Sequence, residues 1–295
     1  MRIKTVLCPV DGSTISEQAV AYAIVVARQF SARLDVIEVI DWTLPPISGV
    51  GVEFLDMPPE VQREVLAQLE RMAAPARASG IPTEVAVDSG PVVRGILTRA
   101  ENVSADLIVI GTHGRSGFER LALGSVAEKV LRKASCPVLT VPPAAGRPGD
   151  APFSKILCAV DLSPASKAAV RTAAAVALRS GGELSVLHVI EWPFGPAAQA
   201  SPAAELLLSL REKAQTELAA LLADADLPGP VSTAIQTGVP KQLILNAAHE
   251  QRADLLVLSV SGRNAIDRAL LGSTTHGVIV ESTCPVLTAR VVEKE

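Results

Sequence analysis

The residues best suited to bind a ligand lie in a glycine-rich stretch that follows an aliphatic segment, residues 107–110. Such a segment is typical of a strand buried on both faces, and it leads directly into Gly111, Gly114 and Gly117. Because glycine has no side chain, the backbone N–H groups of such a loop can approach a ligand closely. This stretch is therefore a candidate anion-binding loop.

A helix is predicted to begin where this loop ends, at Gly124-Ser125. Ser125 is the expected N-cap, and Glu128 three residues later completes a capping box, with the helix running to about Ala134. Free N–H groups and the helix dipole favour anions at a helix N-terminus. Loop and helix together predict a phosphate site, to which Arg115 adds a cation that can contact phosphate.

The glycine spacing excludes two common phosphate motifs. No Gly-Lys-Ser/Thr follows the loop, as a Walker motif requires, and no Gly-x-Gly-x-x-Gly opens the helix, as in dinucleotide-binding proteins. A second candidate is Asp11, in the turn Asp11-Gly12-Ser13 after the first apolar segment. Its carboxylate can accept hydrogen bonds from a ribose or adenine group, although aspartate in a turn is also ordinary turn chemistry.

The chain is an internal repeat: residues 1–145 and 152–295 are two copies, joined by a Pro/Gly/Ala linker. KTVLCPVDGS recurs as KILCAVDLS, VIEVIDW as VLHVIEW, and ADLIVIGTHGRSGFERLALGS as ADLLVLSVSGRNAIDRALLGS. The candidate residues pair accordingly: Asp11 with Asp161, Val39 with Val189, Gly111 with Ser259, Gly114 with Gly262, Gly124 with Gly272, and Ser125 with Ser273. The same chemistry is thus expected twice.

Each copy alternates strands and helices, which predicts a parallel sheet covered on both faces. In the first copy we expect strands near 3–10, 34–40, 83–87, 106–110 and 137–141, and helices from near Ser16 and over 59–78, 92–102 and 125–134. Helices near 167–179, 202–224, 240–251 and 273–282 repeat the scheme. Pro75 is expected to kink or fray its helix. The natural doubly wound strand order is 3-2-1-4-5, which brings the Asp11 turn and the glycine loop to one edge.

The spacing Gly111-x2-Gly114-x9-Gly124-Ser125, followed by a helix and CPVLTV, resembles the ATP-binding signature of the universal stress protein family. The resemblance covers nearly the whole chain and implies two tandem, doubly wound, five-stranded α/β domains, Rossmann-like and similar to the adenine nucleotide alpha-hydrolase fold. It implies ATP as the ligand, with or without Mg²⁺. In that family an aspartate and a valine hold the adenosine end, and the glycines and serine hold the phosphates.

Carried over residue by residue, the resemblance implies ligand contacts from Asp11, Val39, Gly111, Gly114, Gly124 and Ser125 in the first copy, and from Asp161, Val189, Gly262, Gly272 and Ser273 in the second. Ser259 stands where the first copy has a glycine, and its side chain is expected to crowd the second phosphate loop. Together with the missing capping box in the second copy, this predicts that the first copy binds ATP more tightly.

Partners follow from the edges and from the composition. The last apolar strands, 138–141 and 286–291, would be exposed edges, and the resemblance implies that they pair the two copies about a pseudo-twofold axis. We further expect a homodimer and an unidentified protein partner. A net charge of −4 and 3% aromatic residues argue against nucleic acid. The apolar runs are too short for a signal peptide or a membrane helix, so the protein is predicted to be cytoplasmic.

Other polar groups give weaker signals. His113 lies in the glycine loop but is not repeated, which argues against a catalytic role, and no CxxC or HxxxH predicts a metal site. The cysteines form two repeated pairs, Cys8 with Cys158 and Cys136 with Cys284, best read as small buried hydrophobes. Trp42 and Trp192, after the second strand of each copy, either line the cleft or pack beneath the next loop.

Three functions remain open. The first is an ATP-binding regulatory protein of the stress response, with little or no catalysis, because no repeated base, nucleophile or metal cluster accompanies the loop. The second is an adenine-nucleotide-dependent enzyme that hydrolyses ATP slowly or adenylates a substrate. The third is an interaction scaffold whose sites are empty.

Overall fold

The computed structural model describes residues 3–41, 57–114, 123–149, 152–192, 203–225, 227, 229–259 and 271–290. The chain divides into two compact units, Arg2–Pro148 and Gly149–Glu295, which are described separately below. Within the described residues, no helix is long and apolar enough to cross a bilayer.

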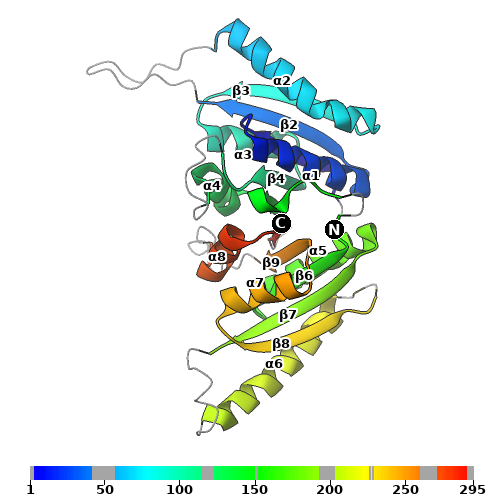
Figure 1. The fold of residues 1–295 in the computed structure, drawn as a ribbon, viewed down its shortest axis with the longest axis vertical. Coiled ribbons are helices and arrows are strands. Elements are labelled where there is room, and N and C mark those ends of the chain that lie inside the picture. The colour runs from blue at the N-terminus through cyan, green and yellow to red at the C-terminus, as the bar shows by residue number, and fades with distance from the viewer. Residues whose placement is uncertain are drawn as a thin grey trace, which may run out of the picture. The chain divides into compact units, whose positions relative to one another are not determined.

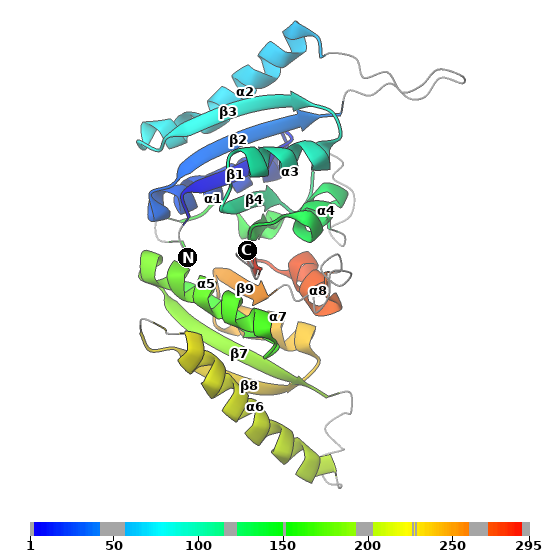
Figure 2. The same cartoon turned by 180° about the vertical axis from the view of Figure 1, so that it is seen from behind.

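The first unit alternates strands and helices as expected. Its elements are β1 (Thr5–Val10), α1 (Thr14–Phe30), β2 (Arg33–Ile40), α2 (Pro59–Ala78), β3 (Thr83–Ser89), α3 (Val92–Asn102), β4 (Leu107–Gly111), α4 (Ser125–Lys133), β5 (Val138–Val141) and a short 3₁₀ turn, η1 (Pro143–Ala145). The strands are parallel in the order β3-β2-β1-β4-β5, which confirms the doubly wound sheet. Helices α1 and α2 cover one face, and α3 and α4 the other (Figures 1 and 2).

The second unit repeats this architecture. Its elements are β6 (Lys155–Val160), α5 (Pro164–Ser180), β7 (Glu183–Glu191), α6 (Ala203–Ala225), β8 (Ser232–Gly238), α7 (Pro240–Glu250), β9 (Leu255–Ser259), α8 (Ser273–Glu281) and β10 (Val286–Ala289). These strands are also parallel, in the order β10-β9-β6-β7-β8. Figure 2 shows α5 and α6 on the face of this sheet that is nearer the viewer.

The central strands are apolar because both of their faces are covered. All six residues of β1 are buried, and the first four residues of β4 are buried beside it. Burial on two faces explains why these strands read as continuous aliphatic runs rather than alternating patterns. Since β1 and β4 are neighbours, the loops that follow them meet at one edge of the sheet, at the predicted switch point.

Helix α1 differs from the sequence prediction at its start, whereas helix α2 has the predicted range. Helix α1 begins at Thr14 rather than near Ser16, because Ser13 caps it by accepting the N–H of Ser16 at 3.2 Å. Helix α2 continues to Ala78, three residues beyond Pro75. Pro75 lies in the last turn, where its carbonyl accepts the N–H of Ser79 at 3.1 Å, so the helix does not end at the proline.

Candidate functional site

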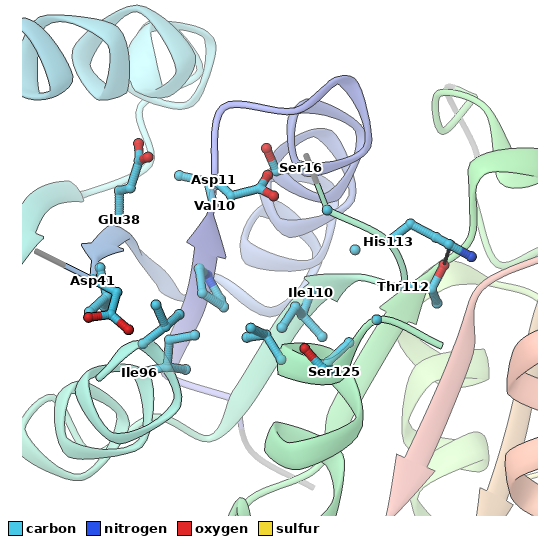
Figure 3. Close-up of a pocket in the computed structure, with 18 of the residues that line it drawn as sticks. Val10, Asp11, Ser16, Glu38, Asp41, Ile96, Ile110, Thr112, His113 and Ser125 are labelled. Atoms are coloured by element: carbon cyan, nitrogen blue, oxygen red, sulfur yellow. Dashed lines mark hydrogen bonds between the residues drawn. The ribbon is translucent and has the colours of Figure 1, made fainter. Parts of the chain in front are cut away.

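A cavity of about 420 Å³ opens at the carboxyl ends of β1, β2 and β4 in the first unit. Its lining comes from these strand ends, from the first turns of α3 and α4, and from the turn after β1 (Figure 3). The lining residues are Pro9, Val10, Asp11, Ser16, Glu38, Val39, Ile40, Asp41, Val92, Ile96, Ile110, Gly111, Thr112, His113, Gly114, Gly124, Ser125, Val126 and Ala127. Every described candidate residue of the first copy therefore lies on one cavity.

The glycines of the loop are required by protein contacts. A Cβ at Gly111 would lie 2.8 Å from Cγ2 of Ile15, and a Cβ at Gly114 would lie 2.7 Å from Oδ2 of Asp11. Both distances are shorter than real Cβ contacts allow, so a side chain here would displace its neighbour. The turn after β1 and the glycine loop thus pack against each other directly through these two glycines.

Asp11 is fixed from two sides. Its Oδ1 accepts the N–H of Ser13 at 3.1 Å, as in an Asx turn, and its Oδ2 lies against the backbone of Gly114. The turn interpretation and the ligand interpretation of Asp11 are therefore compatible, because the same carboxylate shapes the turn and lines the cavity.

The start of α4 differs from the predicted capping box. Gly124 is the N-cap, its N–H donates to the carbonyl of Thr112 at 2.8 Å, and no side chain caps the helix. Ser125 is the first helical residue rather than the cap, and Glu128 pairs with Arg132 at 3.3 Å instead of turning back to the N-terminus. The capping box is therefore wrong: the close contact between Gly124 and Thr112 moves the helix start by one residue.

This arrangement still leaves an anion-favouring helix end. Ser125, Val126 and Ala127 form the first turn of α4 and line the cavity. The first N–H groups of a helix have no partner within the helix, and the helix dipole adds partial positive charge there.

The opposite part of the cavity is mostly apolar. Val39, which is 8% exposed, packs so closely on α3 that a Cβ at Gly95 would lie 2.7 Å from its Cγ1. Val92 and Ile96, one turn apart on α3, line the same wall. A flat aromatic ring suits such a wall better than a charged group does.

Sequence reasoning missed several lining residues. Ile96 and Val92 read as ordinary core positions of a helix, although their place directly after β3 puts them at the ligand-binding edge of the sheet. Glu38 is a carboxylate only 3% exposed, and it lines the cavity from the middle of an apolar strand. The available signal for Glu38 was a charged residue inside the apolar run VIEVI, where charged residues are rare.

His113 lines the same cavity from the loop after β4. Its Nδ1 lies 2.9 Å from Oγ1 of Thr112, while its buried Nε2 has no hydrogen-bond partner among the described residues. Figure 3 shows Thr112 and His113 together, on the side of the cavity away from Glu38 and Asp41.

A second cavity, of about 380 Å³, lies at the equivalent edge of the second unit. Asp161, Val189, Gly272 and Ser273 all line it, together with Ala159, Val160, Leu187, His188, Glu191, Pro240, Ile244, Leu258, Ser259, Thr274 and Thr275. Residues 115–122 and 260–270, which include the candidates Arg115 and Gly262, lie outside the described residues.

Asp161 accepts hydrogen bonds from two serines of its own turn and helix. Its Oδ1 accepts the N–H of Ser163 at 3.0 Å and the hydroxyl of Ser166 at 2.7 Å. Burial alone would raise the pKa of Asp161, but the hydrogen bonds from Ser163 and Ser166 outweigh burial and lower the pKa below its usual value. In the first copy the equivalent hydroxyl, on Ser16, donates to the carbonyl of Ser13 at 2.8 Å instead.

The exchange of Gly111 for Ser259 is accompanied by a second exchange on the neighbouring helix. In the first copy the space beside Gly111 is filled by Ile15, whereas the residue equivalent to Ile15 is Ala165. The larger residue at one position is thus matched by a smaller residue at the other. Crowding of the second phosphate loop by this side chain stays a prediction, because residues 260–270 of that loop lie outside the described residues.

Trp192 and the cysteines are packing residues. Trp192 packs against Ile190, Leu207 and Ala214, a small hydrophobic cluster beneath α6, while Trp42 lies outside the described residues. All four cysteines are buried, as expected: Cys8, Cys136, Cys158 and Cys284. Burial raises the pKa of the Cys8 thiol, and that of the Cys158 thiol to about 12.

Comparisons with known proteins agree with this geometry. The model of the universal stress protein family matches the chain twice, over residues 2–142 and 152–290. A universal stress protein of Mycobacterium tuberculosis is 28% identical over 302 residues, which cover 97% of this chain and 96% of that protein. One of Methanocaldococcus jannaschii is 36% identical over 143 residues, 47% of this chain and 81% of that protein. A solved universal stress protein from Archaeoglobus fulgidus has a TM-score of 0.67 at 25% identity, covering 99% of this chain and 97% of that one.

Proposed function

Because the chain belongs to the universal stress protein family, we propose that it is an ATP-binding regulatory protein of the stress response. In this proposal, occupancy of the cavity changes the conformation of the chain or its binding to a partner protein. Chemistry on the nucleotide is slow or absent.

One observation carries the proposal: the first cavity has an apolar end and an anion-favouring end. Val39, Val92 and Ile96 would hold adenine at the apolar end. The N–H groups at the start of α4 would hold phosphates at the other. Asp11, which lines the cavity, would accept hydrogen bonds from ribose hydroxyls.

The cavity fits a nucleotide in size as well as in polarity. Its volume of about 420 Å³ falls within the range of small-molecule sites, which is about 300–1,000 Å³. Among the described residues no three carboxylate, histidine or cysteine side chains are grouped to hold a metal ion. Mg²⁺, if it accompanies ATP, would then be held mainly by phosphate oxygens and water.

The test is direct binding. We expect mass spectrometry of small molecules released from freshly purified protein, followed by calorimetry of the stripped protein, to identify ATP as a ligand. Ser125→Glu, an exposed position at the first turn of α4, is expected to weaken binding to the first site by charge repulsion. A protein that neither carries nor binds an adenine nucleotide would favour the scaffold function.

The alternative is an enzyme, and one observation favours it: the buried Nε2 of His113, unpartnered among the described residues, is placed on the cavity. A product assay separates the two functions. The regulatory proposal expects phosphate release from ATP to be slow and unchanged in His113→Gln, whereas loss of rapid turnover in that variant would establish the enzyme.

The pairing of the two copies, the homodimer and the cytoplasmic location rest on the family and on composition, and they stay predictions. Light scattering tests the dimer: twice the 30.7 kDa chain mass is expected, and one chain mass would contradict it.

A further inference from the structure

The two cavities differ most at the first turn of the helix that closes each of them. In the first cavity this turn contributes Ser125, Val126 and Ala127, and in the second it contributes Ser273, Thr274 and Thr275. Two aliphatic side chains are thus replaced by two hydroxyls at the end where helix N–H groups are free. Hydroxyls donate hydrogen bonds to phosphate oxygens, so the first turn of α8 offers more phosphate donors than the first turn of α4.

Ser259 adds a further hydroxyl to this end of the second cavity. It is the last residue of β9, only 9% exposed, and it lines the cavity. In the part of the chain that the structure describes, its side chain has no hydrogen-bond partner. Because the hydroxyl lies on the cavity, it can donate a hydrogen bond to a ligand oxygen there.

The charged residues that line the two cavities also differ, and the difference favours phosphate binding in the second cavity. Glu38 lines the first cavity, and the equivalent residue in the second is His188, whose Nδ1 donates to the carbonyl of Val160 at 2.9 Å. The described lining of the second cavity therefore has one carboxyl group fewer, with Asp161 and Glu191 against Asp11, Glu38 and Asp41 in the first. Repulsion between like charges is felt most in a partly enclosed site.

We propose that the two cavities sort adenine nucleotides by phosphate charge. The second copy holds the ligand with the longer phosphate chain, and the first favours a nucleotide with fewer phosphates. This inference rests on the proposed function, since it assigns a ligand preference to each nucleotide site. It reverses the order of ATP affinity that the sequence predicts.

The experiment uses the full chain with one site blocked at a time. Ser125→Glu and Ser273→Glu are matched changes at exposed first helical residues, where a carboxylate is tolerated by the helix dipole. Each places a negative charge at the phosphate end of one cavity and leaves the other cavity intact. Calorimetry with AMP, ADP, ATP and inorganic triphosphate then measures the remaining site.

With Ser125→Glu, which leaves the second site, affinity is expected to rise at least tenfold from AMP to ATP. With Ser273→Glu, which leaves the first site, the rise is expected to be less than threefold. Adding Thr274→Val and Thr275→Ala to Ser125→Glu installs the first copy's residues and should bring the tenfold rise down toward threefold. Equal rises at the two sites, or a steeper rise at the first, would overturn the sorting.

Failure of the proposed function gives a different result. If no adenine nucleotide binds the unaltered chain while inorganic triphosphate binds only through the second cavity, the nucleotide function and the sorting of nucleotides fall, and only the phosphate preference of the second cavity stands. If no probe binds the unaltered chain, both are overturned.

Discussion

Gly114 is a glycine because the carboxylate of Asp11 occupies the space that a side chain would need. Sequence reasoning assigned this glycine to close approach of a phosphate, and the structure adds a second reason inside the protein. The candidate residues Asp11 and Gly114 were predictable because they follow strands at a switch point. Their contact was not predictable, since it depends on side-chain directions across two loops that are about 100 residues apart in sequence.

Gly114→Val tests the loop geometry. The new side chain would push against Asp11 and distort the loop, so we expect ATP binding at the first site to weaken by about 1–3 kcal/mol. Calorimetry measures the change. Gly149→Ala is the matched control, because nothing lies within 4 Å of a Cβ there. Unchanged affinity in a folded Gly114→Val protein would place the nucleotide elsewhere.

The buried thiols predict a loss of stability at high pH. Burial raises the pKa of Cys8, and that of Cys158 to about 12, so the unfolded chain ionises these thiols first. The unfolded state then binds fewer protons, and the free energy of unfolding falls above the ordinary thiol pKa, by about 1.4 kcal/mol per pH unit for each thiol. Denaturation at pH 8 and pH 10 should show a shallower fall in Cys8→Ala/Cys158→Ala than in the unaltered chain. Parallel falls would contradict the argument.

At the scale of elements, the sequence predicted the helices best where a strong pattern met clear end signals. Helices α2 and α3 occupy the predicted ranges, 59–78 and 92–102. The start of α4 was wrong because a Ser-x-x-Glu pattern satisfies the capping rule locally, while a long-range hydrogen bond from Gly124 to Thr112 decides the real end. Local rules carry no information about such contacts.

Helix α3 is held to the sheet by an ion pair that differs between the copies. Arg99 donates to both carboxylate oxygens of Asp35, at 3.0 and 2.6 Å, and only 4% of the Asp35 side chain is exposed. The hydrogen bonds and charge of Asp35 raise the pKa of Arg99 despite its partial burial. In the second copy a hydrogen bond of 2.6 Å from Ser185 to Gln251 occupies the equivalent place on the sheet.

Arg99→Ala is expected to lower the free energy of unfolding by about 3 kcal/mol, because Asp35 is left buried and unpaired. Urea denaturation measures this. Arg94→Ala, on the exposed side of the same helix, is the control and should change little. Adding Asp35→Ser should recover part of the loss. A double variant as unstable as Arg99→Ala alone would show that the unpaired carboxylate is not the cause.

At the scale of the whole molecule, the repeat allowed the fold of each unit to be predicted before any contact was known. It predicted two equivalent sites less well, because the two copies differ in pairs of residues that lie on separate elements. The sequence argument for a tighter first site used Ser259 and the box Ser125…Glu128, and the structure contradicts the box. Comparing one residue with its equivalent in the other copy is therefore a weak guide to which site binds ATP more tightly.

Two cavities predict two nucleotides per chain. We expect calorimetry at saturating ATP to give a stoichiometry of two for the unaltered chain, and of one for either Ser125→Glu or Ser273→Glu. The physical reason is that each unit completes its cavity from its own strands and helices. A stoichiometry of one in the unaltered chain would mean that one of the two cavities does not bind ATP.

The exchange of Ile15 and Gly111 for Ala165 and Ser259 also restricts the order in which the copies diverged from a common ancestor. Starting from isoleucine and glycine, a serine gained first would overpack the contact at a cost of about 1–3 kcal/mol, a large share of the stability of a typical domain. Shrinking the partly buried isoleucine first leaves a gap beside the glycine instead of a clash. The tolerated intermediate has alanine at the helix position and glycine at the strand position. This holds whether the ancestor had isoleucine and glycine or alanine and serine. A glycine in this loop can thus remain fixed in one lineage through its neighbour alone, with no demand from the ligand.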